Sequence, residues 1–292
     1  MDTNHPNGLL SAQRVAGLPA GVEWIMRRRF LPALASVLMV AQTGASSALD
    51  LQSHRALYRM VLSRSRPSVD VVAADGAMMY RIARGCDGWT VENRTILSLL
   101  YSNDTEADTV WSFASWESAD GLKFRFHARF EQDGRTIEKL EGEAVLPSAG
   151  AAGTARFTEP PEIEVRLPQG TIFPTEHIRQ MIAAAEKGHG SLSRVVFDGA
   201  SLENPYLVNA LFGPLPLASA EELARAAGLP MQPAWWTRLA FFPTEGIEPA
   251  PEFEVGARYR ADGIADDILQ TFGNFSLDVR LTKIELLPPP DC

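Results

Sequence analysis

The chain has two cysteines, and thiol chemistry is the first chemistry that their positions allow. Cys86 lies in the short run Gly85–Trp89, and Cys292 is the last residue. A redox role favours a neighbouring resolving thiol, often in a Cys-x-x-Cys spacing, and this sequence has no such spacing. Two arrangements fit the residues. One is a long-range disulfide, the common outcome for two cysteines in an exported chain; the other is a buried Cys86 thiol with a separate terminal thiol.

Histidines, carboxylates and serines form no recognisable catalytic or metal-binding pattern. Two adjacent carboxylate pairs occur, Asp266 with Asp267 and Glu221 with Glu222. Neighbours point to opposite sides of a strand and diverge by about 100° on a helix, so neither pair converges on one substrate. Ser191 lacks a Gly-x-Ser-x-Gly context, and no His-x-x-x-His spacing occurs. We therefore expect no enzymatic activity, no cofactor and no metal site. The four histidines of the exported chain are at positions 54, 127, 177 and 189.

An export signal explains the N-terminal region. Three consecutive arginines precede the apolar stretch 30–40, which is too short to span a bilayer. Small residues follow, and they fit cleavage by a signal peptidase after Ala48. We therefore expect residues 1–48 to form the signal peptide, with translation starting at the first residue or at Met26. Residues 49–292 then form one periplasmic β domain that is not embedded in the membrane.

The charge balance excludes several classes of partner. The full chain carries 27 Lys and Arg against 36 Asp and Glu, and residues 1–48 hold four of the basic and two of the acidic side chains. The exported domain therefore has a net charge of about −11. Because phosphate backbones and anionic lipid surfaces repel such a chain, we expect no nucleic-acid partner and no peripheral attachment to a membrane.

Alternation of apolar and polar residues predicts a mainly β domain. In the clearest run, Leu122 to Phe130, apolar side chains at every second position oppose Lys, Arg and His. Asp-Gly pairs at 75–76, 120–121 and 133–134 predict turns, a pattern typical of antiparallel strands that follow one another along the chain. Further strands are expected over 55–63, 69–82, 89–101, 110–116, 136–146, 163–167, 192–197, 235–242, 253–260 and 275–287.

Two segments have a helical pattern instead. Thr175 fits the N-cap of a first short helix, whose apolar residues share one side and which Gly188 ends. Ser219 and Glu222 form a capping box for a second, which Gly228 ends. We therefore expect two short helices beside a large sheet.

Four segments carry a family resemblance: His54–Tyr58, Gly85–Arg94, Phe197–Gly199 and the final Leu-Pro stretch ending in Cys292. Together they resemble the EipB-type cell-envelope integrity proteins of alphaproteobacteria, over essentially the whole mature chain. The resemblance implies a periplasmic, strongly bent antiparallel sheet, either a β-spiral or an open half-barrel, with two short helices and a Cys86–Cys292 disulfide. It also implies a role in envelope integrity, a partner with tetratricopeptide repeats and no established enzymatic activity.

Candidate binding residues come from the aromatic content and from the first family-like segment. Trp235 and Trp236 are neighbours on a predicted strand, so one must point away from the face that buries the other. Together with His54 and Arg55 they are the candidate binding residues. A protein partner is the leading hypothesis, and a carrier or chaperone for lipids or lipoproteins is the alternative. A solvent-facing patch of aromatics and Arg would favour the partner, whereas a dry concave cavity would favour the carrier.

Overall fold

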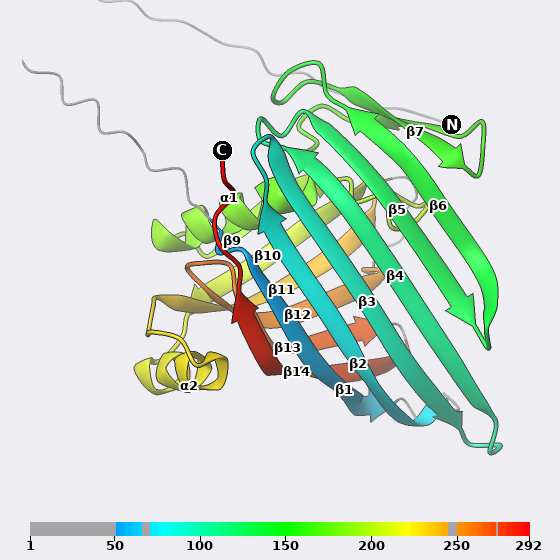
Figure 1. Ribbon diagram of the computed structural model, residues 1–292, viewed down its shortest axis with the longest axis vertical. Helices are drawn as coiled ribbons and strands as arrows, with labels where there is room; N and C mark the ends of the chain where they lie inside the picture. The colour runs from blue at the N-terminus through cyan, green and yellow to red at the C-terminus, as the bar shows by residue number, and fades with distance from the viewer. Residues whose placement is uncertain (1–50, 66–70, 245–249, 273) are drawn as a thin grey trace, which may run out of the picture. The chain divides into compact units, whose positions relative to one another are not determined.

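Strands make up most of the computed structural model, which describes residues 51–65, 71–244, 250–272 and 274–292 (Figure 1). The predicted signal peptide, with its cleavage after Ala48 and the alternative start at Met26, lies outside the described residues. The strands are β1 (His54–Ser65), β2 (Val71–Arg84), β3 (Gly88–Tyr101), β4 (Glu106–Ser118), β5 (Lys123–Gln132), β6 (Arg135–Val145), β7 (Gly153–Glu159), β8 (Glu164–Leu167), β9 (Ser191–Val196), β10 (Tyr206–Pro214), β11 (Ala234–Pro243), β12 (Phe253–Arg260), β13 (Ala265–Phe272) and β14 (Phe275–Leu286). The helices are α1 (Pro174–Glu186) and α2 (Leu217–Ala227).

All the strands belong to one antiparallel sheet. Its order is β8-β7-β6-β5-β4-β3-β2-β1-β14-β13-β12-β11-β10-β9. Strands that are neighbours in the chain therefore pair with each other, except β8 and β9, and β1 pairs with β14. The two end strands, β8 and β9, do not pair with each other, so the sheet is open. The prediction of a mainly β domain with an open antiparallel sheet and two short helices is confirmed.

The sheet bends back so strongly that distant strands meet on its inner side. Figure 1 shows β2 to β6 lying in front of β11 to β13, with the two groups of strands crossing. Phe197, which directly follows β9, packs edge-on against Phe124 and Phe126 of β5, with ring centroids 6.3 and 5.6 Å apart. It also meets Phe157 of β7 at 6.5 Å. Because β9 and β5 are far apart in the strand order, these contacts require the predicted strong bend.

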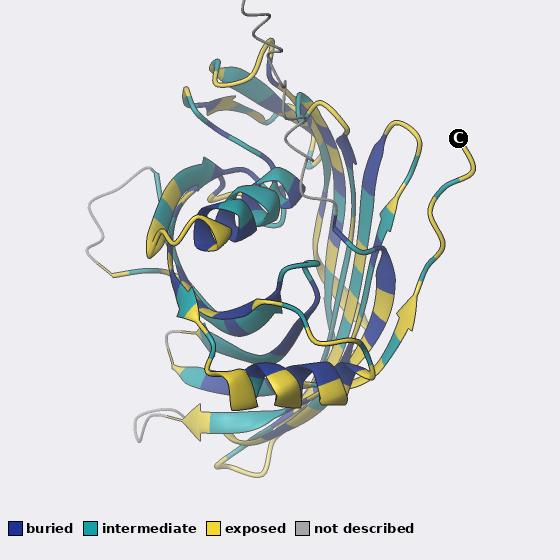
Figure 2. Ribbon diagram, turned by 90° about the vertical axis from the view of Figure 1, so that its left-hand side faces the viewer, coloured by how far each residue is buried: buried dark blue, intermediate teal, exposed yellow. Residues whose placement is uncertain are grey.

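Alternating side chains place this aromatic core on the inner face. In β5, Phe124, Phe126 and Ala128 are buried, whereas Lys123 and Arg125 are exposed, as the sequence pattern predicts. Figure 2 shows the same alternation of buried and exposed residues along neighbouring strands. One side of the sheet therefore faces solvent and the other encloses the core.

The predicted turn at Asp75 and Gly76 is wrong, because both residues lie inside β2. A Cβ atom on Gly76 would stand 2.3 Å from the Ile96 carbonyl oxygen of β3. Glycine therefore serves here for the close approach of two strands rather than for chain reversal. The other two predicted turns occur, with Gly121 and Gly134 at φ values of +68° and +74°.

Helix α1 is capped by a residue that is distant in sequence. The prediction of Thr175 as its N-cap is wrong, because Phe173 is the N-cap and Pro174 already begins the helix. The carboxylate of Glu117, at the end of β4, instead accepts hydrogen bonds from the N–H groups of Thr175 at 2.7 Å and Glu176 at 3.0 Å. This carboxylate therefore does what an N-cap side chain does, and it ties α1 to the sheet.

Helix α2 also begins earlier than the sequence predicts. Its N-cap is Pro216, and the N–H of Ser219 donates to the Pro216 carbonyl at 2.9 Å, so Ser219 lies within the first turn. The predicted capping box is therefore wrong. Glu222 instead accepts a hydrogen bond from Arg258 of β12 at 3.1 Å, which attaches the helix to the sheet. The predicted end is correct, because Gly228 has a left-handed φ of +65°.

A disulfide joins Cys86 to Cys292, with their Cα atoms 5.7 Å apart. Cys86 lies between β2 and β3, in a turn where the Gly85 N–H donates to the Gly88 carbonyl at 2.7 Å. The bond fastens the segment after β14 to this turn. Of the two arrangements that the cysteines allow, the structure has the disulfide.

Candidate functional site

The four predicted binding residues do not come together, because they lie in pairs on opposite faces of the sheet. His54 and Trp235 are buried on the inner face, whereas Arg55 and Trp236 are exposed on the outer face. Arg55 forms an exposed ion pair with Glu285 at 3.5 Å, a contact that adds little stability. The split of the tryptophan pair follows from the strand period, and the same rule separates His54 from Arg55.

Trp236 borders a shallow groove on the outer face of β10 to β13. Its indole is 46% exposed and packs on Gly213 of β10, where a Cβ atom would stand 2.8 Å from the indole nitrogen. The glycine thus leaves room for the ring on the strand surface. We call this hollow of about 380 Å³ the outer groove; it is bordered by Leu211, Trp236, Arg238, Gly256, Leu269 and Thr271.

A cavity of about 490 Å³ lies inside the bent sheet, which we call the apolar chamber. Most of its lining is hydrophobic and comes from strands in both halves of the sheet, and it includes Met60, Leu97, Leu99, Phe130, Phe253 and Leu277. Its volume lies within the range of about 300–1,000 Å³ that is typical of small-molecule sites. It therefore has the size and lining of a site for an apolar ligand.

A second cavity of about 340 Å³, the polar chamber, adjoins the first. Both are lined by Asn93, Trp111, Asp198, Val255 and Gln270 among others, so the two cavities lie next to each other inside the sheet. The second differs in chemistry, because its lining adds several hydroxyl and ring nitrogen groups. These belong to His54, Tyr58, Tyr80, Ser115 and Tyr259.

The family-like segment Phe197–Gly199 places an acidic side chain at this junction. Phe197 anchors the segment in the aromatic core, and Gly199, at φ +67°, accommodates the Phe126 ring, which would stand 2.3 Å from a Cβ atom. The Asp198 carboxylate accepts hydrogen bonds from the Ala200 N–H at 2.9 Å and the Asn204 side-chain amide at 2.8 Å. Asp198 is therefore held in a fixed position against both chambers.

Burial keeps the groups of the polar chamber uncharged or reduces their tendency to ionise. It lowers the pKa of His54, whose Nδ1 donates to the Gln52 carbonyl at 2.7 Å. It raises the pKa of both Tyr80 and Tyr259, so their phenols stay protonated. It also raises the pKa of Asp198, although the two hydrogen bonds that this carboxylate accepts act in the opposite direction.

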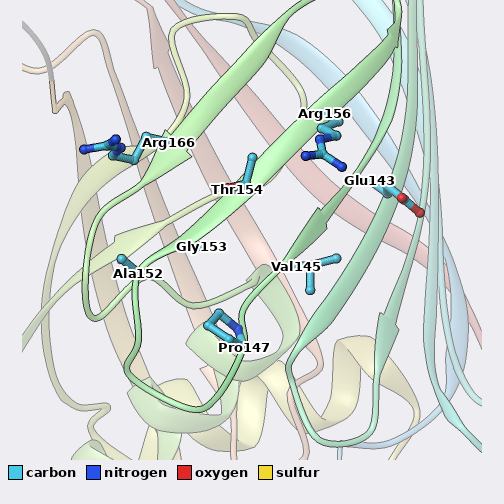
Figure 3. Close-up of a pocket in the computed structure, with 8 residues that line it drawn as sticks. All are labelled: Glu143, Val145, Pro147, Ala152, Gly153, Thr154, Arg156 and Arg166. Atoms are coloured by element: carbon cyan, nitrogen blue, oxygen red, sulfur yellow. The ribbon is translucent and has the colours of Figure 1, made fainter.

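A third hollow, of about 510 Å³, lies over β6 to β8 and is a weaker candidate (Figure 3). Arg156 and Arg166 border it, and Figure 3 shows them on opposite sides of Thr154 rather than directed at one point. Arg156 is paired with Glu164 at 2.9 Å, and both side chains are exposed. A ligand there would compete with water at every polar contact.

The adjacent carboxylates Asp266 and Asp267 both contact Arg258. Asp266 binds its guanidinium with both oxygens at 2.8 Å, and Asp267 lies 3.6 Å from it and also pairs with Arg280 at 3.0 Å, so both serve as partners of arginines. Over the described ranges, no cluster of histidine, cysteine and carboxylate side chains has the composition of a metal site. Within the same ranges, no helix has the length and hydrophobicity needed to cross a bilayer.

Comparison with known proteins identifies the family. The model of the EipB-like family matches residues 45–288. The chain belongs to the EipB-like family. This EipB-like chain is 24% identical over 245 residues to the cell envelope integrity protein EipB of Brucella abortus (strain 2308). The aligned region covers 83% of this chain and 86% of that relative. It is also similar to the crystal structure of a beta-barrel-like protein of a domain of unknown function from Brucella abortus, with a TM-score of 0.75 and 23% identity over 82% of this chain and 99% of that one. The resemblance that the sequence shows is confirmed.

Sequence reasoning missed most of the residues that line the two chambers. Of its predicted candidates, only His54 lines a chamber, whereas Trp235 packs in the core with Trp89. The strand period gives the inward-facing residues of each strand, including Asn93 and Leu97 of β3. It does not show that β3 lies across an open space from β12, and that information would have been needed to find the site.

Proposed function

We propose that this EipB-like protein supports cell-envelope integrity in the periplasm as a non-enzymatic binding protein that holds one acyl chain of a lipid or lipoprotein inside its bent sheet. The name of its Brucella relative supports the envelope role. The apolar chamber supports the mode of action, because its cavity of about 490 Å³ has a mostly hydrophobic lining on which an acyl chain would bury apolar surface. That chamber is the observation that carries the proposal.

Filling the apolar chamber is expected to weaken binding. Thr95 lies on the inner face of β3 and lines the chamber, so Thr95→Phe adds an aromatic ring inside it while keeping a residue that strands accommodate well. We expect affinity for the uncharged fluorophore N-phenyl-1-naphthylamine to fall by about tenfold or more, measured by fluorescence titration.

Ile96→Phe is the matched control, because the next residue of the same strand is 47% exposed on the outer face. It should bind the fluorophore like the unmodified protein, and lauroylglycerol should displace the dye from both. Unchanged binding in a folded Thr95→Phe protein, or no binding by the unmodified protein, would contradict the proposal.

A protein partner is the second candidate function, favoured by the outer groove. There an exposed Trp236 stands beside Arg238 and Leu211, a combination common in binding surfaces. The family resemblance gives the kind of partner, a periplasmic protein with tetratricopeptide repeats. This mode would operate on the opposite face of the sheet from the chambers.

Trp236→Ala tests the partner directly. We expect its affinity for a purified periplasmic tetratricopeptide-repeat protein of the same organism to fall by about tenfold or more, with an unchanged melting temperature. Trp235→Ala is the contrasting variant, because its buried ring packs in the core and its loss should cost about 3–5 kcal/mol of folding free energy. Undiminished binding by Trp236→Ala would remove the outer groove from consideration.

A further inference from the structure

The two chambers inside the sheet differ in chemistry in the way that the two ends of an amphiphile do. The apolar chamber is walled mainly by hydrocarbon, including Leu97, Phe130 and Leu277. The adjoining polar chamber is lined by the phenols of Tyr80 and Tyr259. A ligand that spans both would place its chain in the first and a hydrogen-bonding group in the second.

Fixed positive charge is missing from this interior. Among the described residues that line the two chambers there is no lysine or arginine, whereas Asp198 lines both and Glu254 lines the apolar one. A carboxylate or phosphate drawn inside would therefore lose its water without gaining a counter-charge, and would meet Asp198. Burial of an unpaired charge is far more costly than burial of a hydrogen-bonded neutral group.

A cationic group would also find no free carboxylate as a partner on the part of the polar chamber's wall that the structure describes. The carboxylate of Asp198 already accepts hydrogen bonds from Ala200 and Asn204, which keep it against the wall of the cavity. Glu254 also borders the outer groove, and the other polar groups that line the two chambers are neutral. These groups include the hydroxyls of Tyr80 and Tyr259 and the side-chain amides of Asn93 and Gln270. The Nδ1–H of His54 is already used in a hydrogen bond to the Gln52 carbonyl.

From this arrangement we infer that the cavity selects amphiphiles whose polar end is uncharged, an acyl ester or acyl amide, with the chain in the apolar chamber and the ester or amide group in the polar chamber. The inference deepens the proposed function and rests on it. An ester would come from a glycerolipid and an amide from an N-acylated lipoprotein. Both present a carbonyl that accepts a hydrogen bond from a phenol, and neither carries a charge at that group.

Four ligands that share one twelve-carbon chain test the selection by isothermal titration calorimetry on the mature protein. They are lauroylglycerol, lauroylglycinamide, laurate and dodecyltrimethylammonium. We expect each neutral ligand to bind at least about tenfold more tightly than either charged one. Tighter binding of the ester would indicate a glycerolipid source, and tighter binding of the amide a lipoprotein source. Laurate or the cation binding as tightly as the neutral ligands would overturn the inference.

Variants in the polar chamber separate this inference from the proposed function. Tyr259→Phe should weaken the binding of lauroylglycerol by about three- to tenfold and leave the binding of N-phenyl-1-naphthylamine unaffected, because only lauroylglycerol has a carbonyl that accepts a hydrogen bond from the lost hydroxyl. Gln270→Lys should raise the affinity for laurate, whereas the matched Gln270→Leu should not.

If the fluorophore binds and all four chain ends bind equally, the inference fails and the acyl-chain site stands. If neither the fluorophore nor any of the four ligands binds, the proposed function itself fails.

Discussion

Replacing Cys292 with serine is expected to lower the free energy of unfolding by up to about 5 kcal/mol and to lower the melting temperature by about 10–20 °C. The disulfide links residues that are 206 positions apart, so its loss frees a long loop in the unfolded chain. It also releases the segment after β14. There the Leu287 N–H still donates to the Ser53 carbonyl at 2.9 Å, close to the point where the β1–β14 ladder ends. Calorimetry gives both quantities, and thiol titration should find one free thiol, at Cys86.

The double variant Cys86→Ser/Cys292→Ser is the matched control. Either substitution removes the whole cross-link. The free energy of unfolding of the double variant should therefore lie within about 0.5 kcal/mol of that of the single variant. The unmodified protein treated with a reductant should approach the same value. Equal melting temperatures for the Cys292→Ser and unmodified proteins would show that the disulfide contributes nothing to stability.

The strands were predictable because their side chains alternate between two different environments. Phe124 and Phe126 meet an aromatic core while Lys123 and Arg125 meet water, so the period of two is visible in the sequence. The same period showed that one of two adjacent tryptophans is exposed, although it did not show which. Gly76 is the exception, because a glycine that serves close strand packing resembles a turn glycine in sequence.

Helix starts could not be predicted because their partners are far away in the chain. Thr175 and Ser219 are residue types that favour N-caps, but Pro174 and Pro216 set the chain direction earlier. The N–H groups of α1 are then bound by Glu117, 58 residues before Thr175. The cavity was hidden for a similar reason, since its wall depends on how far the sheet bends, and no local pattern encodes that bend.

Two buried ionisable groups lie at the N-terminus of α1, and their pKa shifts have opposite effects on how the stability of the fold changes with pH. Burial raises the pKa of Glu117 to about 7, even though the Thr175 and Glu176 N–H groups favour its charged form. Burial lowers the pKa of His177 to about 4, and the nearby charge of Arg194 adds to this. The Nε2 atom of His177 is buried with no hydrogen-bond partner among the described residues, so its protonation would place an uncompensated charge inside the protein.

The signs of the two contributions follow from linkage. Between pH 4.5 and 7 the folded protein holds the Glu117 proton more tightly than the unfolded chain does, so this group stabilises the fold more as the pH falls. Between pH 4 and 6.5 the unfolded chain binds the His177 proton more tightly, so this group destabilises the fold as the pH falls. Each shift corresponds to about 3 kcal/mol, so in the unmodified protein the two largely cancel.

Glu117→Gln should therefore expose the His177 contribution. Relative to the unmodified protein, the variant is expected to lose about 3 kcal/mol of stability when the pH is lowered from 7 to 4.5, measured by urea unfolding at each pH. His177→Gln should show the opposite change, a relative gain of similar size over the same range. The double variant should follow the unmodified protein, because both opposing terms are gone and the other titrating groups are common to all four proteins. Parallel pH profiles for the Glu117→Gln and unmodified proteins would mean that the Glu117 carboxyl titrates alike in the folded and unfolded chains.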